Sequence, residues 1–251
     1  MKQDSGLKKG WEQYPQKTVE MWDDFVNWNK RKEGEGDFFI NMLKKYNVKT
    51  VLDMACGTGY DSIRLVKEGF KVKSCDGSQE MVKKSIKNAK KEGINLDVIQ
   101  CDWRNLIDKF KKEQFDAIIC LGNSFTHLFS EKDRESVVNQ IYFLLNKGGV
   151  LIIDQRNYDY ILSKGYKSKH KYVYCGETID VDVIHKNDSL VRFKYTKKGN
   201  GYFTLDLYPI RINEMRALIR KAGFESLFTY GDFERTFDKN NTDFIQHIAV
   251  K

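Results

Sequence analysis

No apolar run in this sequence is long enough to cross a lipid bilayer, and no apolar stretch follows the polar, lysine-rich residues 1–10. These absences argue against a membrane protein and against a secretory signal peptide. Proline is scarce, with 2 residues in 251, and no glycine period marks a fibrous protein. With 41% hydrophobic and 13% aromatic residues, the chain is too apolar to be disordered. We therefore expect a globular, cytoplasmic protein of one large domain or two small ones.

Cysteine shows no pattern that would bind metal or build a disulfide framework. The five cysteines are widely spaced, mostly among apolar neighbours, and none forms a CxxC pair: Cys56, Cys75, Cys101, Cys120 and Cys175. An odd number of such residues is typical of reduced, buried thiols. Because no cluster of His and Cys has the spacing of zinc ligands, we expect no metal.

Acidic residues are outnumbered, 35 against 43 lysines and arginines, which gives a formal net charge of +8. A basic chain can bind nucleic acid. Here, however, the lysines fall mostly in pairs on polar segments, such as Lys44-Lys45, Lys83-Lys84 and Lys197-Lys198. Solvent-exposed helix and loop surfaces explain this distribution better, so we expect no nucleic-acid partner.

Short apolar runs alternate with helix-like segments between residues 48 and 154. The runs cover residues 50–54, 71–75, 96–100, 116–121 and 150–153, and the clearest helical segments are 61–68 and 79–92. Repeated alternation of strand and helix predicts an α/β fold with a doubly wound, mostly parallel sheet. Ligands of such sheets bind at the carboxyl ends of the strands, so functional residues are expected there.

The pattern changes after residue 158. Residues 166–207 alternate apolar and polar positions and are rich in β-branched and aromatic types, which predicts a small antiparallel sheet. Residues 17–43 and 213–222 have helical spacing, and the runs 225–230 and 243–250 are expected to close the main sheet. We therefore divide the chain into a helical N-terminal segment closing over the cofactor (1–47), a cofactor-binding core (48–158), an antiparallel lid (159–209), and a C-terminal helix with closing strands (210–251).

The strongest local motif follows the first expected strand, in the sequence Leu52-Asp53-Met54-Ala55-Cys56-Gly57-Thr58-Gly59. Gly57 and Gly59 allow a tight turn that brings backbone N–H groups close to a ligand. Asp61 and Ser62 stand where the dinucleotide pattern GxGxxG would require its third glycine, which weakens the case for a pyrophosphate ligand. On its own, such a pair of glycines is often only a turn.

Acidic residues end the next two expected strands. Asp76 ends the second, where a carboxylate can accept hydrogen bonds from the vicinal hydroxyls of a ribose. Asp102 and Trp103 end the third, and they offer an acceptor for an exocyclic amine and an aromatic face for a base. Each acid taken alone could equally be a helix cap. A ribose and an adenine without phosphates describe S-adenosylmethionine (SAM).

Together, the glycine loop, Asp76 and the Asp102-Trp103 turn resemble the pattern of class I SAM-dependent methyltransferases. The resemblance implies a Rossmann-like α/β core with the antiparallel lid inserted after the fifth strand. It also implies SAM as the cofactor and S-adenosylhomocysteine as the product. Residues 116–128 lack the proline-aromatic tetrapeptide of enzymes that methylate amino groups of nucleic-acid bases, which argues against a base as substrate.

Two longer runs, residues 121–128 and 153–162, resemble the glycine N-methyltransferases. Further matches to their microbial branch, the glycine/sarcosine N-methyltransferases, are Trp22-Asp23 with Trp28 and Arg31, Asp102-Trp103-Arg104, Ser168-Lys169-His170, Tyr174-Cys175-Gly176-Glu177, Tyr230-Gly231-Asp232-Phe233, and Asp243-Phe244 with His247. The matches extend from about residue 11 to residue 251. Because they include the lid, they indicate this branch rather than methyltransferases in general.

The residue types agree with that resemblance. Arg156 stands just past a strand end, and its planar guanidinium can grip a carboxylate bidentately, although it could instead form a surface ion pair. Asn123 can accept a hydrogen bond from an amine, although it could instead be a turn residue after Gly122. The resemblance implies that Arg156 holds the glycine carboxylate, that Asn123 orients the amine, and that both are catalytic together with Tyr174. It further implies a substrate pocket completed by tyrosines: Tyr174, Tyr195, Tyr208 and Tyr14.

The same resemblance implies the cofactor contacts. They are Tyr14, Trp22, Arg31, Ala55, Gly57, Asp76, Met81, Asp102, Trp103, Leu121, Ser124 and His127. Arg31 and Ala55 are expected at the methionine end of SAM. His127 could otherwise be a general base, but a neutral amine needs no base during attack, so we expect a contact role.

The expected reaction is in-line methyl transfer to a neutral amine, which converts glycine to sarcosine and sarcosine to N,N-dimethylglycine without a metal. In the microbial branch these are early steps of betaine synthesis, which serves osmoprotection. One alternative is a glycine-only enzyme that regulates the ratio of SAM to S-adenosylhomocysteine, and another is a binding protein that senses this ratio. Only ten residues precede Trp11, fewer than in the animal branch, so we expect a monomer or a weak homo-oligomer.

Overall fold

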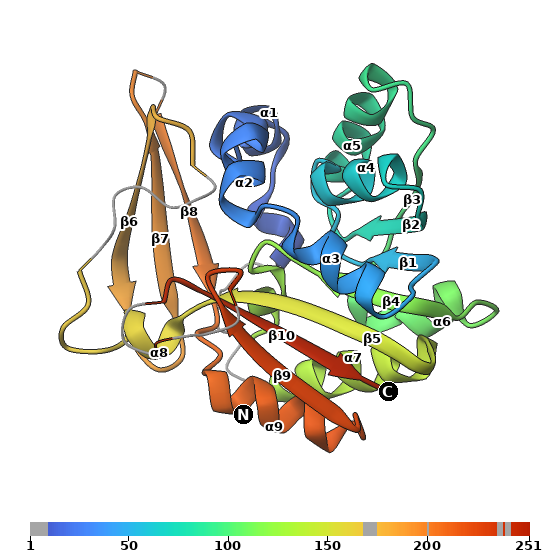
Figure 1. The fold of residues 1–251 in the computed structure, drawn as a ribbon. Coiled ribbons are helices and arrows are strands. Elements are labelled where there is room, and N and C mark those ends of the chain that lie inside the picture. The colour runs from blue at the N-terminus through green and yellow to red at the C-terminus, as the bar shows by residue number, and fades with distance from the viewer. Residues whose placement is uncertain (1–9, 168–174, 200, 235–237, 239–241) are drawn as a thin grey trace.

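The computed structural model describes residues 10–167, 175–199, 201–234, 238 and 242–251 (Figure 1). Their strands form two sheets. The larger has seven strands in the order β3-β2-β1-β4-β5-β10-β9, and the smaller has three in the order β6-β7-β8. The strands are β1 (Thr50–Asp53), β2 (Lys71–Asp76), β3 (Asp97–Gln100), β4 (Phe115–Cys120), β5 (Leu145–Arg156), β6 (Ile179–Lys186), β7 (Val191–Lys197), β8 (Gly201–Leu207), β9 (Ser226–Gly231) and β10 (Phe244–Val250).

The main sheet is mostly parallel, as predicted. β1 pairs in parallel with β2 and β4, β2 with β3, and β4 with β5, whereas β10 is antiparallel to both β5 and β9. The strand order reverses between β1 and β4, and in doubly wound sheets ligands bind at that point. All five predicted core strands are present. The fifth is longer than expected at both ends, because Leu145 pairs with Phe115 of β4 and the pairing with β10 continues to Arg156.

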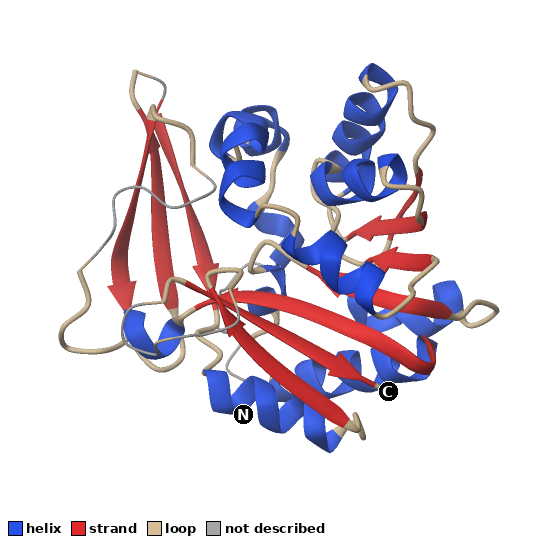
Figure 2. Cartoon of the chain, viewed as in Figure 1, coloured by secondary structure: helices blue, strands red, loops and turns tan. Residues whose placement is uncertain are grey.

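Helices cover both faces of the main sheet (Figure 2). They are α3 (Phe38–Lys45), α4 (Tyr60–Lys67), α5 (Gln79–Lys91), α6 (Leu106–Phe110), α7 (Glu131–Leu144) and α9 (Ile212–Lys221). Because neighbouring strand residues point to opposite faces, Leu52 packs in one apolar cluster with α6, α7 and α9, and Val51 in another with α3 and α4. Burial on both faces explains why these strands have continuous apolar sequences.

The N-terminal segment, expected to be helix-like over residues 17–43, contains three helices. A 3-10 turn, η1 (Gly10–Gln13), precedes α1 (Gln16–Phe25), α2 (Trp28–Glu35) and α3. The Asn27 side chain starts α2 by accepting a hydrogen bond from the Lys30 N–H, the usual role of an N-cap. Gly36 ends α2 with a φ of 53°, which glycine adopts readily. These breaks let the segment bend over the main sheet.

The small sheet is antiparallel, as predicted. A short helix, α8 (Tyr158–Ile161), precedes it, and β7 pairs antiparallel with both β6 and β8. Helix α1 lies between this sheet and α5 (Figure 1). The ring centroids of Phe25 and Phe203 are 4.4 Å apart on one side, and the Asp23 carboxylate is 3.1 Å from Lys84 on the other. The N-terminal segment thus joins the small sheet to the core.

The cysteines behave as their spacing predicted. Cys56, Cys75, Cys101 and Cys120 are buried, Cys175 is partly buried, and all five are free thiols. Three of them pack in the same apolar cluster as α7. None of the helices described in the structure is long and apolar enough to cross a membrane.

Candidate active site

A cavity of about 170 Å³ lies at the carboxyl ends of β1, β2 and β4. Its walls come from η1 and α1, from the loops after these strands, and from β7 and β8 of the small sheet. The structure brings all twelve predicted cofactor contacts to this cavity: Tyr14, Trp22, Arg31, Ala55, Gly57, Asp76, Met81, Asp102, Trp103, Leu121, Ser124 and His127. Asn123, Arg156 and Tyr195 of the predicted substrate pocket line the same cavity.

The glycine loop and Asp76 form one hydrogen-bonded unit. Gly57 and Gly59 have φ angles of 52° and 98°, which residues other than glycine rarely adopt. The N–H groups of Gly57 and Ser78 each donate to one Asp76 oxygen at 2.9 Å. Since a carboxylate oxygen can accept two hydrogen bonds, both oxygens can still accept a hydroxyl. Burial raises the pKa of Asp76 to about 6, so the group is mostly ionised at neutral pH. This geometry fits the vicinal hydroxyls of a ribose.

Trp103 and Trp11 give the cavity two aromatic surfaces. The Trp103 indole N–H donates to a backbone carbonyl, which fixes the ring. Next to it, the Nε of Arg104 lies 3.0 Å from both oxygens of Asp102, and the Arg104 guanidinium lies 5.0 Å from the centre of the Trp11 ring. Flat aromatic walls beside a carboxylate acceptor fit an adenine. With Asp76, they fit the nucleoside part of SAM.

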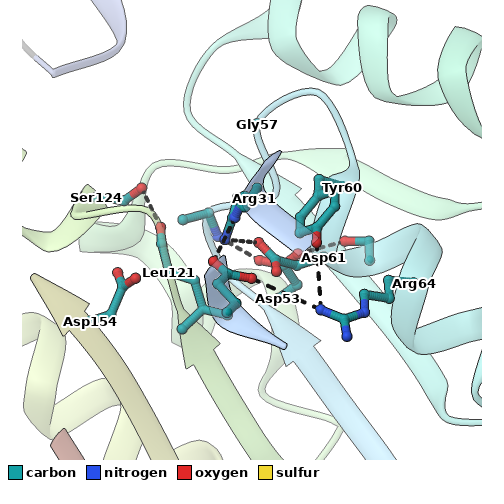
Figure 3. A network of polar contacts seen from close by, with 12 residues as sticks. Arg31, Asp53, Gly57, Tyr60, Asp61, Arg64, Leu121, Ser124 and Asp154 are labelled. Atoms are coloured by element: carbon teal, nitrogen blue, oxygen red, sulfur yellow. Dashed lines mark hydrogen bonds and ion pairs between the residues drawn. The ribbon is translucent and has the colours of Figure 1, made fainter. Parts of the chain in front are cut away.

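A buried ion network lies beside the glycine loop (Figure 3). Arg31 of α2 donates to Asp61 of α4 at 2.8 Å, and its guanidinium lies 4.6 Å from the centre of the Tyr60 ring. Asp53, at the end of β1, accepts a hydrogen bond from the Ser62 hydroxyl at 2.6 Å, and burial raises its pKa to about 7. The resemblance pointed to Arg31, but nothing in the sequence marked Asp61 as its partner, because the two residues belong to different helices.

Asn123 and Arg156 lie at the ends of β4 and β5, and a hydrogen bond joins them. The Asn123 Oδ1 accepts the Arg156 backbone N–H at 2.8 Å, and the Asn123 amide donates to the Tyr158 hydroxyl at 2.9 Å. Asn123 also has a φ of 63°, and its own N–H donates to Asp154 at 2.8 Å. Asn123 is therefore a turn residue and a cavity residue at once. Its amide oxygen holds the Arg156 backbone and also lies 3.3 Å from the Tyr158 hydroxyl.

The Arg156 guanidinium lies among aromatic rings. The residue is only 5% exposed, and its Cζ is 4.9 Å from the centre of the Phe193 ring and 5.1 Å from that of Phe244. This burial rules out the alternative of a surface ion pair. A buried guanidinium at a cavity can bind a carboxylate through two N–H donors in a low-dielectric environment. Phe244 was not predicted in the site, and it meets Arg156 because β10 pairs with β5 in that register.

Tyr14 and His127 form a partly buried, hydrogen-bonded pair between the N-terminal segment and the loop after β4. The His127 Nδ1 lies 2.9 Å from the Ser124 carbonyl oxygen, which can only accept, so Nδ1 carries the hydrogen. Nε2 is then an acceptor, and it receives the Tyr14 hydroxyl at 2.9 Å. Burial lowers the pKa of His127 to about 4, which keeps the ring neutral. The Tyr14 oxygen thus keeps its lone pairs for the cavity.

The structure places Tyr208 outside the cavity, which corrects its prediction as a pocket residue. The centre of its ring lies 3.8 Å from the Arg134 guanidinium, and its hydroxyl donates to Glu214 at 3.4 Å. The physical reason is strand alternation. Leu205 and Leu207 of β8 line the cavity, so the alternating positions face the other way.

Of two other tyrosines predicted in the pocket, one lies in the described part of the structure and one does not. Tyr195 lines the cavity, and its ring stacks on Phe203 at a centroid distance of 4.9 Å. Tyr174 lies outside the described residues. Several lining residues were not predicted, most of them apolar or from other segments of the chain: Trp11, Phe25, Val26, Cys56, Thr58, Tyr60, Asp61, Leu128, Cys175, Leu205, Leu207 and Phe244. In the described ranges, no group of three or more His, Cys, Asp or Glu could hold a metal ion.

Comparison with known proteins identifies the family. Residues 51–149 match the family described as Methyltransferase domain. The chain is 45% identical to the glycine/sarcosine N-methyltransferase of Aphanothece halophytica, over 95% of this chain and 90% of the relative. It is 47% identical to the protein of that name from Halorhodospira halochloris, over 96% and 89%. Identity to the glycine N-methyltransferase of Mus musculus is 33%, over 82% and 79%.

Solved structures agree on the fold. An S-adenosylmethionine-dependent methyltransferase from Clostridium acetobutylicum has a TM-score of 0.71 and 19% identity, covering 93% of this chain and 97% of that one. At this identity the likeness shows the fold alone, whereas the sequence identities to the Aphanothece and Halorhodospira proteins extend over about nine tenths or more of both chains. The chain belongs to the glycine/sarcosine N-methyltransferase family of class I SAM-dependent methyltransferases.

Proposed function

We propose that the protein methylates the amine of glycine to give sarcosine, and that of sarcosine to give N,N-dimethylglycine. The observation that carries this proposal is that Arg156 and Asn123 line the same cavity as Asp76 and are joined by the hydrogen bond from the Arg156 backbone N–H to the Asn123 side-chain oxygen. A small amino acid presents a carboxylate and an amine a few bonds apart. A buried guanidinium and a side-chain amide that line one cavity match those two groups in charge and in hydrogen bonding.

Each end of the cavity has its own part in the proposal. Arg156 binds the substrate carboxylate, Asn123 orients the amine, and Tyr195 and Tyr14 complete the pocket. Tyr174 is assigned to it by resemblance alone. Asp76 binds the ribose, Asp102 and Trp103 the adenine, and the remaining predicted contacts surround the rest of the cofactor: Trp22, Arg31, Ala55, Gly57, Met81, Leu121, Ser124 and His127. When bound, SAM supplies a methyl group activated by the positive charge on sulfur.

The contribution of these residues to catalysis is mostly positioning. Holding a nucleophile in a near-attack geometry can contribute about 7–11 kcal/mol to lowering the barrier. The amine must arrive neutral, since a protonated amine has no lone pair. His127 is an unsuitable base, because its Nε2 already accepts the Tyr14 hydroxyl. The amine therefore loses its proton to water before it binds.

The N-terminal segment and the small sheet are assigned to closing the cavity. Residues 1–47 are proposed to close over the cofactor and residues 159–209 to form a lid on a core of residues 48–158 and 210–251. Tyr14, Trp22 and Phe25 from the first segment and Leu205 from the second all line the cavity, which supports this division. We further propose that the protein acts in the cytoplasm on free amino acids, as a monomer or weak homo-oligomer without a nucleic-acid partner.

The test is methyl transfer from labelled SAM to glycine, sarcosine and dimethylglycine in parallel, with the mass of each product recorded. Transfer to glycine and sarcosine is the expected result, and it would place the protein in the early steps of betaine synthesis. Transfer to glycine alone would favour the glycine-only alternative, for which the lower identity to the mouse relative gives less support. No transfer at all, with SAM still bound, would leave the sensor alternative.

A further inference from the structure

Two carboxylates hold the guanidinium of Arg31. Oε1 of Glu35, one helical turn along α2, accepts the Arg31 Nε–H at 2.7 Å. Oδ2 of Asp61, in the first turn of α4, accepts an Nη2–H at 2.8 Å. Arg31 and Asp61 line the cavity, whereas Glu35 lies behind them with a side-chain exposure of 0%. Oε2 of Glu35 also lies 4.0 Å from the Arg64 guanidinium, but Arg64 does not line the cavity, so Glu35 acts on the cavity through Arg31.

A buried carboxylate in this place needs an explanation, because burial disfavours its charged form. Desolvation raises the pKa of Glu35 to about 7, and the neighbouring Arg31 opposes that shift. Buried ion pairs often stabilise a fold no better than apolar residues of similar size. What such a pair provides is orientation: a planar guanidinium held at Nε and Nη2, with the Tyr60 ring 4.6 Å from its carbon, cannot turn freely (Figure 3).

We propose that Glu35 is a positioning residue for cofactor recognition. It fixes the Arg31 guanidinium so that this cation and the adjacent Asp61 carboxylate together face the amino-acid end of the cofactor. That end carries one carboxylate and one ammonium group, so a cation and an anion 2.8 Å apart at the cavity wall complement it. The inference rests on SAM as the cofactor, but it does not depend on which amine is methylated.

The test compares two ligands by calorimetry. S-adenosylhomocysteine carries the amino-acid end, whereas 5′-methylthioadenosine has the same nucleoside and thioether without it. In Glu35→Ala, the dissociation constant of S-adenosylhomocysteine should rise at least tenfold, while that of 5′-methylthioadenosine should change less than twofold. Glu35→Gln keeps an oxygen that can accept the Arg31 Nε–H, so its effect on S-adenosylhomocysteine should be smaller, between threefold and tenfold.

Glu33→Ala is the matched control, because Glu33 lies on the same helix in an exposed pair with Lys30 at 3.0 Å. It should leave both dissociation constants unchanged. Equal losses for the two ligands in Glu35→Ala would mean that Glu35 only supports the fold, and no loss for either would also overturn the proposal. If Glu35→Ala does not fold, Glu35→Gln decides by the same comparison. No methyl acceptor is present, so failure here leaves the glycine proposal untouched.

Discussion

The cavity is lined by two buried arginines, and the described neighbours of the two differ in kind. Arg31, beside the glycine loop, lies between the carboxylates of Glu35 and Asp61, at 2.7 and 2.8 Å. The surroundings of Arg156, at the end of β5, include the rings of Phe193 and Phe244 at 4.9 and 5.1 Å. Both residues are nearly inaccessible, with exposures of 6% and 5%. The difference is therefore one of chemistry and not of burial.

That difference indicates what each arginine can offer a ligand. Carboxylate partners compensate the charge of Arg31 and fix its direction, so it suits a ligand that carries both signs of charge. Aromatic faces attract a cation, so the rings of Phe193 and Phe244 favour a charged Arg156 that can attract an anion. A guanidinium–carboxylate bond in such a low-dielectric environment is stronger than the same bond in water. We therefore expect substitutions at the two ends to affect different ligands.

Arg156→Ala is expected to give the largest difference between the effect on glycine methylation and the effect on cofactor binding. Removing one partner of a buried, hydrogen-bonded charge pair costs about 2–5 kcal/mol, which lowers kcat/KM for glycine about 30- to 5,000-fold. The dissociation constant of S-adenosylhomocysteine should change less than twofold, because Asp76, Trp103 and Arg31 remain in place. Steady-state kinetics and calorimetry on the same preparation provide the measurement.

Arg192→Ala is the control for Arg156→Ala. Arg192 lies on β7 of the small sheet, and its side chain is 41% exposed and paired with Asp206. Its loss should leave both the kinetics and the binding near those of the unchanged protein. If Arg156→Ala weakened S-adenosylhomocysteine binding as much as it lowered activity, the two ends of the cavity would not be independent, and Arg156 would be structural.

A smaller effect, confined to the cofactor end, is expected from Asp76→Asn. Hydrogen bonds to a charged group contribute about 1.5–3 kcal/mol, so the dissociation constant of S-adenosylhomocysteine should rise about 10- to 150-fold. Ribose hydroxyls donate to the ionised carboxylate, whose pKa is raised to about 6 by burial. The contribution of Asp76 to the affinity should therefore be complete well above pH 6 and be lost as the pH drops through that value. In Asp76→Asn this part of the pH dependence should be absent.

Glu80→Gln is the control for the pH profile. Glu80 lies in the first turn of α5, the helix that follows Asp76, and its carboxylate pairs with Lys83 at 2.7 Å on the surface. It should keep both the affinity and its pH dependence. Glu35 and Asp53, with pKa values raised to about 7, titrate in both proteins and cancel in the comparison. A profile in Asp76→Asn that still falls near pH 6 would assign that titration to another group.

How far the sequence predicts this site depends on how local each feature is. Asp76, Asn123 and Arg156 could be found because each follows a buried strand, and the carboxyl ends of parallel strands converge at one edge of the sheet. Phe244 and Glu35 could not be found in this way. Phe244 meets Arg156 through the register of an antiparallel strand far along the chain, and Glu35 does not line the cavity but contacts the Arg31 guanidinium inside α2.

The fold shows the same division. The core strands were predicted because burial on both faces gives them continuous apolar sequences. The breaks of the N-terminal segment at Asn27 and Gly36 were missed, because a cap and a left-handed glycine interrupt a helix without changing its apolar spacing. The sequence alone predicted Tyr208 in the pocket. Composition shows neither where β8 ends nor which of its alternating residues face the cavity.

The smallest effect is expected at the boundary between the two ends, from Tyr14→Phe. The Tyr14 hydroxyl donates to the Nε2 of His127, so its lone pairs face the cavity. A weak C–H···O contact to such an oxygen contributes about 0.5–1 kcal/mol, which predicts a fall in kcat of about 2- to 5-fold. Both KM for glycine and the dissociation constant of S-adenosylhomocysteine should stay within twofold, since neither arginine is touched.

Tyr202→Phe serves as its control, because Tyr202 lies on β8 with 64% exposure and should show no effect on kcat. An unchanged kcat in Tyr14→Phe would mean that the Tyr14 oxygen does not meet the reacting group. A loss confined to KM for glycine would move Tyr14 to the substrate end beside Arg156, and a loss confined to S-adenosylhomocysteine affinity would move it to the end that holds Arg31. The division of the cavity between its two arginines thus predicts which parameter the residue between them controls.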